Sequence, residues 1–380
     1  MRTVTGQVAF RRTDIARLLS IALAIGLLGF GAKQIVSAWQ RNVGLMQLMS
    51  DSPIQIVEGN LALAVHNGDR RAQFWLCYLY AFQGQPNEVQ HVCPDSKEVA
   101  YWLVLQGRNL YDTDPYRSIA LFRQAIAVAP DYSGAYFFGG QSYQRLQNYE
   151  QAIAWYTHAL EAGNFDSRLT SESGATHHRA GYAGIERTYQ RLAESYIALR
   201  DWESAKKAVE RLLEMRPGLA DGYYLKGQID YFRVVYNQVD NPDSTLRAAE
   251  ESFRAAINRE PRHFWAHVFL GRVYGQMGRL DDAQAEFEIA VSVDPSDPSG
   301  RLELGHTYLI LGRVDEAVHH LEAVVRYYPD HLGAWMSLGD AYVAQGKWEL
   351  ARQAFRRALE IDPANKQARK CLQLISSRKQ

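Results

Sequence analysis

The sequence predicts an all-α fold built from repeated pairs of helices, and three spacings lead to that prediction. A glycine, a tyrosine and a proline each recur at the same constant interval and in one common register. The positions are Gly271, Gly305 and Gly339, then Tyr274, Tyr308 and Tyr342, then Pro295, Pro329 and Pro363. Three residue types that keep one period indicate three copies of one unit between Phe264 and Pro363.

Each repeated residue has a physical role in a helix–turn–helix unit. Gly271 lets a second helix approach the first closely, and Tyr274 fills the wedge between helices. Gly278 follows the first helix, where a residue in the left-handed conformation closes its C-terminus. Asp281 and its neighbour open the second helix, at the positive end of the helix dipole. Pro295 ends the unit because it cannot donate the next helical hydrogen bond.

This pattern resembles the tetratricopeptide repeat (TPR), a helix–turn–helix unit of about 34 residues. The resemblance covers Val99 to Asn365 and implies a TPR-type α-solenoid, a right-handed superhelix of stacked helix pairs. We assign the chain as follows: a linker and diverged N-terminal helical repeat at 40–98, repeats 1 and 2 at 99–166, a loop insertion at 167–185, repeats 3 to 7 at 186–365, and a C-terminal capping helix at 366–380.

Two units depart from the pattern. The first has Gln106 where the close-contact glycine is expected, although Gly107 is adjacent. The unit from Ala220 to His263 is ten residues longer than the others, and we expect the extra residues between its two helices. Asp243 or Ser244 is then the expected N-cap of its second helix, since short polar side chains accept hydrogen bonds from free helix N–H groups.

The N-terminus predicts a membrane anchor. Residues 1–17 form a basic tail, and Leu18 to Trp39 is apolar enough and long enough for one transmembrane helix. The excess of arginine before this helix predicts a single-pass protein of the cell membrane with a cytoplasmic N-terminus and an extracytoplasmic repeat domain. A cleaved signal peptide and a buried soluble helix are the alternatives.

Composition excludes some classes of function. The chain has 42 Lys plus Arg and 42 Asp plus Glu in 380 residues, so its net charge of zero argues against nucleic-acid binding through phosphate contacts. We find no catalytic motif, no metal-ligand motif and no cofactor motif, and we expect no enzyme activity. His319 and His320 are adjacent on an expected helix and point in different directions, which argues against a shared metal ion. His177 and His178 are adjacent in the loop insertion, where no other motif supports a metal site.

The three cysteines are Cys77, Cys93 and Cys371, and none forms a CxxC pair. Cys77 and Cys93 are either two buried thiols, which we favour, or a disulfide if the domain lies in an oxidising compartment. Cys371 falls on the apolar side of the capping helix.

The family resemblance implies that the first helix of each repeat lines a concave groove. Its exposed sites are the second, fifth, ninth, twelfth and thirteenth positions of a repeat. The residues at these sites are aromatic or amide-bearing in large part, which suits the binding of a peptide. The candidates are Phe137, Gln141, Gln144, Arg145, Arg187, Gln190, Glu194, Tyr224, Gln228, Tyr231, Trp265, Arg272, His306 and Asp340.

Our leading hypothesis is a membrane-anchored, non-enzymatic scaffold that holds a protein or peptide partner in this groove. The alternative is an accessory subunit of a larger membrane complex, such as a secretion, pilus or envelope-polysaccharide apparatus. Such a subunit would make its contacts through the membrane helix and through convex or inserted surfaces. A third possibility is an enzyme with a site in the insertion at 167–185.

Overall fold

The computed structural model describes residues 85–93, 96–166 and 184–377, together with single residues between 62 and 81. This part of the chain contains helices and no strand, so the all-α prediction is confirmed for it. None of the helices described there is long and apolar enough to cross a membrane. The predicted tail and anchor at 1–39 and residues 167–183 of the insertion lie outside the described residues.

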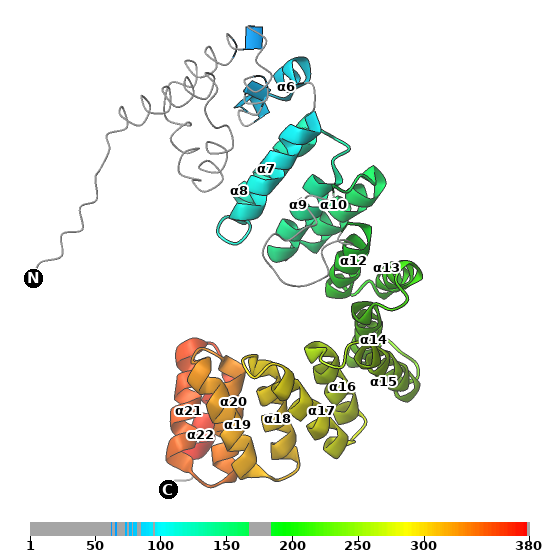
Figure 1. The fold of residues 1–380 in the computed structure, drawn as a ribbon. Coiled ribbons are helices and arrows are strands. Elements are labelled where there is room, and N and C mark those ends of the chain that lie inside the picture. Colours follow the sequence, from blue (N-terminus) through cyan, green and yellow to red (C-terminus); the bar gives the residue numbers. More distant parts are fainter. Residues whose placement is uncertain are drawn as a thin grey trace, which may run out of the picture. The chain divides into compact units, whose positions relative to one another are not determined.

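The chain divides into two compact units, Met1–Thr188 and Tyr189–Gln380. The described helices of the first unit are α6 (Pro86–Val92), α7 (Ser96–Leu110), α8 (Pro115–Val128), α9 (Ser133–Arg145) and α10 (Tyr149–Ala162) (Figure 1). The division between the units falls inside the next helix, α12 (Ile185–Leu199).

The second unit continues with the longest run of hairpins. Its further helices are α13 (Trp202–Met215), α14 (Ala220–Val235), α15 (Pro242–Arg259), α16 (Phe264–Gln276), α17 (Leu280–Val293), α18 (Pro298–Ile310), α19 (Val314–Tyr327), α20 (Leu332–Ala344), α21 (Trp348–Ile361) and α22 (Lys366–Ser377). We call α7, α9, α12, α14, α16, α18 and α20 the first helices, because each opens a hairpin.

The repeated glycine allows close packing within each hairpin. A Cβ atom on Gly271 would lie 2.6 Å from the ring of Phe287, and one on Gly339 would lie 2.6 Å from the ring of Phe355. In the first repeat a Cβ on Gly107 would lie 2.4 Å from the ring of Phe122. Gly107, and not the residue before it, therefore takes the close-contact role there, one position later than the sequence register places it.

The repeated tyrosine joins successive hairpins. The hydroxyl of Tyr308 donates to Glu288 over 3.1 Å, and that of Tyr342 donates to Glu322 over 2.6 Å. Tyr274 donates to Glu250 over 3.2 Å and also accepts a hydrogen bond of 2.8 Å from Arg254. All of these partners lie on the second helix of the preceding hairpin, 20 residues earlier for Glu288, Glu322 and Arg254 and 24 for Glu250. The tyrosine thus fills the wedge and also fixes the position of the neighbouring repeat.

The turns inside the hairpins use a left-handed residue. Gly278, Gly312 and Gly346 have φ values of 74°, 72° and 71°, as predicted. The corresponding turns after α9, α12 and α14 use Gln147, Arg200 and Asn237, which have φ values of 57°, 61° and 54°.

The second helix of the longest hairpin begins earlier than the sequence predicts. Asn241, and not Asp243 or Ser244, is the N-cap of α15, since its side chain accepts a hydrogen bond from the backbone N–H of Ser244. Pro242 occupies the first position of the helix, where its missing N–H costs nothing.

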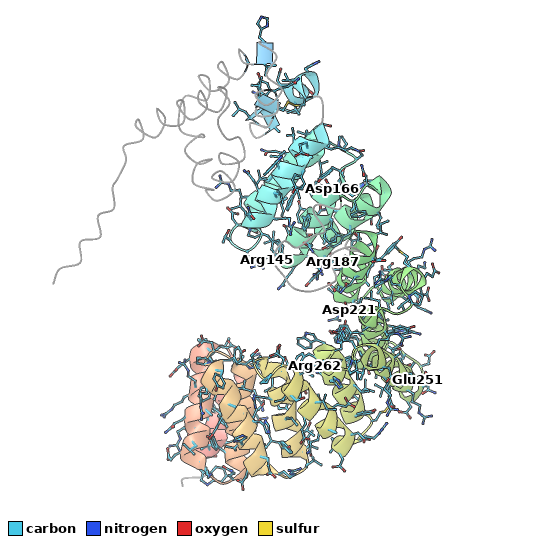
Figure 2. The ribbon with its side chains drawn as sticks, viewed as in Figure 1. Arg145, Asp166, Arg187, Asp221, Glu251 and Arg262 are labelled. Carbon is cyan, nitrogen blue, oxygen red and sulfur yellow. A yellow bond between two sulfur atoms is a disulfide. The ribbon has the colours of Figure 1, made fainter. Side chains whose placement is uncertain are left out.

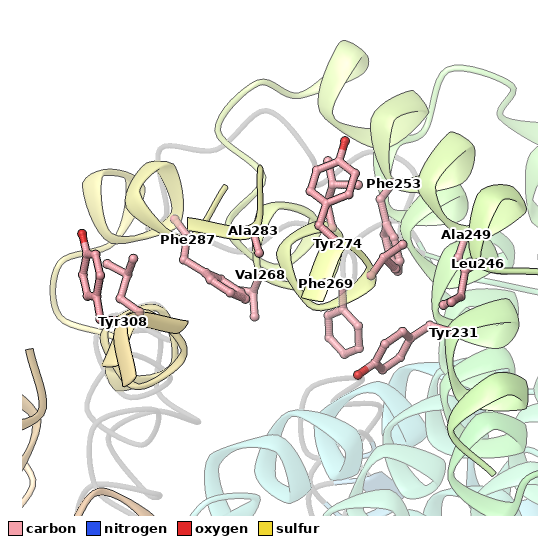
Figure 3. Close-up of a cluster of buried hydrophobic side chains, with 14 of the residues drawn as sticks. Tyr231, Leu246, Ala249, Phe253, Val268, Phe269, Tyr274, Ala283, Phe287 and Tyr308 are labelled. Atoms are coloured by element: carbon pink, nitrogen blue, oxygen red, sulfur yellow. The ribbon is translucent and has the colours of Figure 1, made fainter. Parts of the chain in front are cut away.

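The core of the second unit is rich in aromatic rings in contact with one another (Figure 3). Phe269 lies between Phe253 and Tyr231, with ring centroids at 5.7 Å and 5.5 Å. At the end of the chain, Ala368 and Ile375 of α22 are buried, and Cys371 packs half-buried against the same cluster as Ile375. The capping helix therefore closes the core with the face that the sequence predicts.

Cys77 and Cys93 form a disulfide, with their Cα atoms 5.6 Å apart. The alternative of two buried free thiols, which the sequence favoured, is not what the structure has. Val89 and Val99 lie in the same buried cluster as Cys77.

Candidate functional site

A polar row crosses the first helices of the second unit, and its members are Arg272, Glu303, His306, Ser337 and Asp340. Arg272 donates to the Glu303 carboxylate from Nε and Nη2, at 2.8 Å and 2.7 Å. His306 Nε2 lies 2.6 Å from Ser337 Oγ. Each contact joins the ninth residue of one repeat to the sixth residue of the next, 31 residues further along the chain. The row is therefore built from the repeat itself.

The hydrogen bonds define the state of His306. Ser337 donates its hydroxyl proton to the carbonyl of Gly333 over 3.0 Å, so His306 Nε2 carries a proton and donates to Ser337. Burial lowers the pKa of His306, which favours the neutral ring. Nδ1 then carries no proton and remains an acceptor.

Asp340 ends the row, and it differs from the other members. It is exposed, and within the described residues no cation forms an ion pair with it. Partial burial raises the pKa of Asp340, although the nearby His306 opposes that shift. No hydrogen bond joins Asp340 to His306 in the described chain, so Ser337, His306 and Asp340 are not arranged as a nucleophile, base and orienting acid.

Aromatic side chains extend the row toward α14. The guanidinium of Arg272 lies 4.9 Å from the centroid of the Phe269 ring, which in turn contacts Tyr224 edge-on with centroids 5.7 Å apart. The Tyr224 hydroxyl accepts a hydrogen bond of 2.7 Å from Gln228, and burial raises the pKa of Tyr224. His263 lies against the same ring, at 5.0 Å.

His263 holds the first turn of α16 in place. Its Nδ1 accepts a hydrogen bond from the backbone N–H of Ala266, so its Nε2 donates to Asp221 over 3.1 Å. Asp221 belongs to the first turn of α14 (Figure 2). The contact therefore ties two neighbouring first helices together at the aromatic end of the polar row.

The candidates from the second unit fall into three groups. Tyr224, Gln228, Arg272, His306 and Asp340 belong to the polar row or its aromatic extension. Gln190 and Glu194 lie one hairpin earlier on α12, where Gln190 donates to Glu194 over 3.3 Å.

The two remaining groove candidates of the second unit, Trp265 and Tyr231, differ in exposure. Trp265 is 40% exposed, whereas Tyr231 is only 8% exposed because the rings of Phe232 and Phe269 cover it. The expected exposure of Tyr231 is therefore wrong.

The candidates from the first unit do not form a comparable row. Phe137 is 5% exposed, packed against Phe138 and Tyr156, so its expected exposure is also wrong. Gln144 accepts a hydrogen bond of 2.8 Å from Tyr156. Arg145, labelled in Figure 2, forms an ion pair of 2.9 Å with Asp112 in the turn before α8. Gln141 and Arg187 are half-buried.

The sequence reasoning missed five members of the site: Asp221, His263, Phe269, Glu303 and Ser337. Three of them, Phe269, Glu303 and Ser337, occupy the sixth position of their repeats. A search for complementary residues 31 positions apart would have paired Arg272 with Glu303 and His306 with Ser337. The ninth position can be read from a single repeat, whereas its partner lies on the next one.

The histidine pair of α19 is part of the packing. His320 stacks on Tyr308 with ring centroids 5.5 Å apart, and burial lowers the pKa of His320. His319 is exposed, and its ring is nearly perpendicular to that of His320. Nowhere in the described residues do three or more His, Cys, Asp or Glu side chains gather as metal ligands would. His177 and His178 lie outside the described residues.

Two sequence profiles, both described as tetratricopeptide repeat, match this chain. One matches residues 110–167, 245–298, 270–318 and 302–366, and the other matches residues 186–218. Together these segments cover more than half of the chain. The chain belongs to the tetratricopeptide-repeat family. Members of this family generally act as non-enzymatic scaffolds that bind protein or peptide partners.

Several known proteins are similar to this chain. A TPR protein of Parabacteroides merdae has a TM-score of 0.52 at 17% identity, covering 73% of this chain and 98% of its own. A TPR protein of Thermus thermophilus has a TM-score of 0.45 at 20% identity, covering 56% of this chain and 99% of its own. Protein bimA of Emericella nidulans is 32% identical over 93 residues, which is 24% of this chain. The chain spans only 10% of the length of bimA.

Proposed function

We propose that this TPR protein is a membrane-anchored scaffold that holds an extended segment of a protein partner on the first helices of its second unit. The observation that carries the proposal is the polar row, which crosses α16, α18 and α20 and continues through Phe269 and Tyr224 to α14. A continuous strip of mixed aromatic and polar groups matches an extended peptide, which presents both backbone polar groups and side chains.

The chemistry of the row suits a protein ligand better than a charged small molecule. Its one arginine is already paired, because the side chains of Arg272 and Glu303 are 29% and 21% exposed and bonded to each other. Tyr224 and Gln228 supply an amphipathic ring and an amide, which contact both apolar side chains and peptide groups. The row therefore offers many moderate contacts and no concentrated positive charge.

The predicted helix at Leu18–Trp39 supplies the membrane attachment in this proposal, with the repeats on the extracytoplasmic side. The disulfide between Cys77 and Cys93 supports that side, because disulfides persist in oxidising compartments. Attachment to the bilayer raises the effective concentration of the scaffold near a membrane partner, so moderate affinity suffices.

Site-specific photo-crosslinking tests the groove. A photoreactive residue placed in the full-length protein at Gln228 or Asp340 is expected to give a crosslinked partner in intact membranes. The same residue at Glu251 of α15, labelled in Figure 2, or at Arg356 of α21 serves as the control, since both positions are exposed on second helices. Equal crosslinking at all four positions would contradict a partner held on the first helices.

The membrane part has its own test. Reporter fusions after residue 45 and after the last residue are both expected to be active only outside the cytoplasm. The protein is expected to stay in the membrane fraction after washing with high salt or carbonate. Release by carbonate would show that 18–39 is not a spanning anchor, and it would leave the groove proposal intact.

The accessory-subunit alternative rests on a different observation. Tyr116 of α8 and Tyr327 of α19 are each 73% exposed, so each offers a large amphipathic ring to a neighbouring subunit. Under this alternative, mild detergent releases the protein in a large assembly, and changing both tyrosines to serine dissociates it. Under the leading proposal the double change leaves crosslinking at Gln228 unaltered.

A further inference from the structure

The surface that carries the polar row, which we call the face of the first helices, does not end at α20. The capping helix α22 continues the same repeat register. Cys371 and Leu374 lie one repeat period after Ser337 and Asp340, so they occupy the sixth and ninth positions of an eighth first helix. Cys371 packs against the buried cluster that includes Leu338 and Tyr342 of α20, on either side of Asp340 in the sequence. Burial and, second to it, the Asp340 carboxylate raise the pKa of the Cys371 thiol. The polar row thus continues from Asp340 to Cys371, and Leu374 follows on the same face.

This end of the face is unlike the α16 end. Arg272 and His306, at the ninth positions of their repeats, are half-buried and bonded to the next helix. Asp340 and Leu374, at the same position, are exposed, Leu374 by 58%. At the ninth position the face therefore changes from two side chains bonded to the next helix to an exposed carboxylate followed by an exposed leucine.

No ion pair joins the carboxylate of Asp340 to a cation among the described residues, and burial favours the neutral form of the nearby His306. The other acid of the row, Glu303, is matched, since it binds Arg272. Cys371 carries no positive charge in either protonation state, so it does not compensate the charge of Asp340. A partly desolvated carboxylate without a counter-charge gains free energy when a lysine or arginine approaches it.

We propose that the α20–α22 end of this face is a subsite for a lysine or arginine side chain of the bound segment, next to an aliphatic or aromatic side chain that covers Leu374. The inference rests on the proposed function and specifies the ligand for it. Neighbouring helices are about 8–10 Å apart and an extended peptide advances about 3.3 Å per residue, so the two side chains are about three residues apart. The expected ligand is therefore basic and apolar, and not an acidic tail.

The test is selection of a randomised twelve-residue peptide library against the full-length protein in detergent, followed by affinity measurement on the most enriched synthetic peptide. The enriched peptides are expected to share a lysine or arginine with an apolar residue about three positions away. Replacing that basic residue by alanine is expected to weaken binding to the wild-type protein about three- to tenfold. The same replacement is expected to have little effect on binding to Asp340→Asn.

Asp330→Asn is the matched control, because Asp330 lies in the turn before α20, its side chain is 87% exposed, and the change removes the same charge. Asp340→Asn is expected to weaken binding and Asp330→Asn to leave it unchanged. Asp340→Lys is expected to shift the selected peptides from basic to acidic at that position.

Two results would overturn the subsite, and they separate it from the proposed function. If binding falls with Arg272→Gln but not with Asp340→Asn, the peptide lies on the face but the cation site is wrong. If neither variant affects binding, the peptide lies elsewhere, and the groove proposal fails as well.

Discussion

The hairpin α9–α10 of the first unit and the hairpin α16–α17 of the second have the same packing but different chemistry. In both, a glycine lies under an aromatic ring. A Cβ atom on Gly140 would lie 2.6 Å from the ring of Tyr156, and one on Gly271 would lie 2.6 Å from the ring of Phe287. In both, the repeated tyrosine accepts a hydrogen bond from an arginine 20 residues earlier. Gln144 of α9 is bonded within its own hairpin and Arg145 to the preceding turn, whereas Arg272 of α16 reaches forward to the next first helix. The repeat thus fixes the packing and leaves the exposed face free to vary.

The largest expected effect tests the part that the two hairpins share. Gly140→Val and Gly271→Val are each expected to destabilise their hairpin by about 3 kcal/mol, because the new side chain overlaps a buried ring. Gly275→Ala is the control in α16, since a Cβ there has no atom within 4 Å. Hydrogen exchange of the two hairpins measures the effect. A mild result in one hairpin only would show that their packing differs.

The next effect depends on a position where the hairpins differ. Tyr136 contacts Trp155 edge-on in α9–α10, and the same two positions hold His267 and Glu286 in α16–α17. His267 Nδ1 lies 2.6 Å from the Glu286 carboxylate, and Nε2 lies 3.0 Å from the carbonyl of Pro261. Both nitrogens therefore donate, which requires the charged ring. Burial alone lowers the pKa of His267, but the hydrogen bonds to Glu286 and Pro261 outweigh it and raise the pKa above its ordinary value of 6.5.

The pKa of His267 is higher in the folded protein than in the unfolded chain, so its charged ring stabilises the fold. This stabilisation is complete below pH 6.5 and is lost as the pH rises through the pKa of His267 in the folded protein. His267→Gln is expected to cost about 2 kcal/mol at pH 6 and to abolish this dependence. Hydrogen exchange of α16–α17 between pH 6 and 9, corrected for the intrinsic exchange rate, measures it. The hairpin α9–α10 serves as the internal reference, and an equal pH dependence there would exclude His267 as the cause.

A smaller effect concerns the ion pairs. A double-mutant cycle with Arg272→Gln and Glu303→Gln is expected to give a coupling of about 1 kcal/mol, since both side chains are less than a third exposed. The pair of Arg145 and Asp112, with side chains 42% and 78% exposed, is expected to give a coupling near zero. Thermal unfolding of the single and double variants measures both cycles. Equal couplings would mean that the polar row is no more rigid than an ordinary surface pair.

The smallest effect concerns the turns. Gln147 adopts φ of 57° in the turn after α9, where the corresponding Gly278 after α16 has φ of 74°. Gln147→Gly is expected to stabilise the first unit by about 0.5–1 kcal/mol, because glycine has no steric penalty there. Asn237→Gly is expected to change stability by less, since asparagine tolerates this conformation. A loss of stability in Gln147→Gly, measured by thermal unfolding, would refute the strain argument.

The sequence predicts the fold well because the fold depends on residues that repeat. Gly271, Tyr274 and Gly278 each have the role that their spacing indicates. The N-cap of α15 was misplaced because Asn241 precedes a proline, and the prediction started the helix after that proline.

The face of the first helices was harder to predict, since exposure depends on what the neighbouring side chains cover. Phe137 and Tyr231 occupy positions of the repeat that normally face the groove, yet adjacent rings bury both. Glu303 and Ser337 were missed because their roles exist only in relation to a residue on another repeat. Single positions thus predict packing, and pairs of positions are needed to predict a surface.

Bonded residues on successive first helices are always 31 positions apart in the polar row. Deleting one whole repeat would therefore keep the packing of the helices but change which side chains of the row meet. Removing residues 297–330, one full repeat period, would join Ser296 to His331 and bring α20 directly after α17. Tyr342 would then bond to Glu288 instead of Glu322, so its partner would still be a glutamate. Arg272 would face Ser337 instead of Glu303 and would lose its acidic partner. The shortened chain would keep its architecture and lose its charge pairing, so the length of the array and the specificity of its surface can change independently of each other.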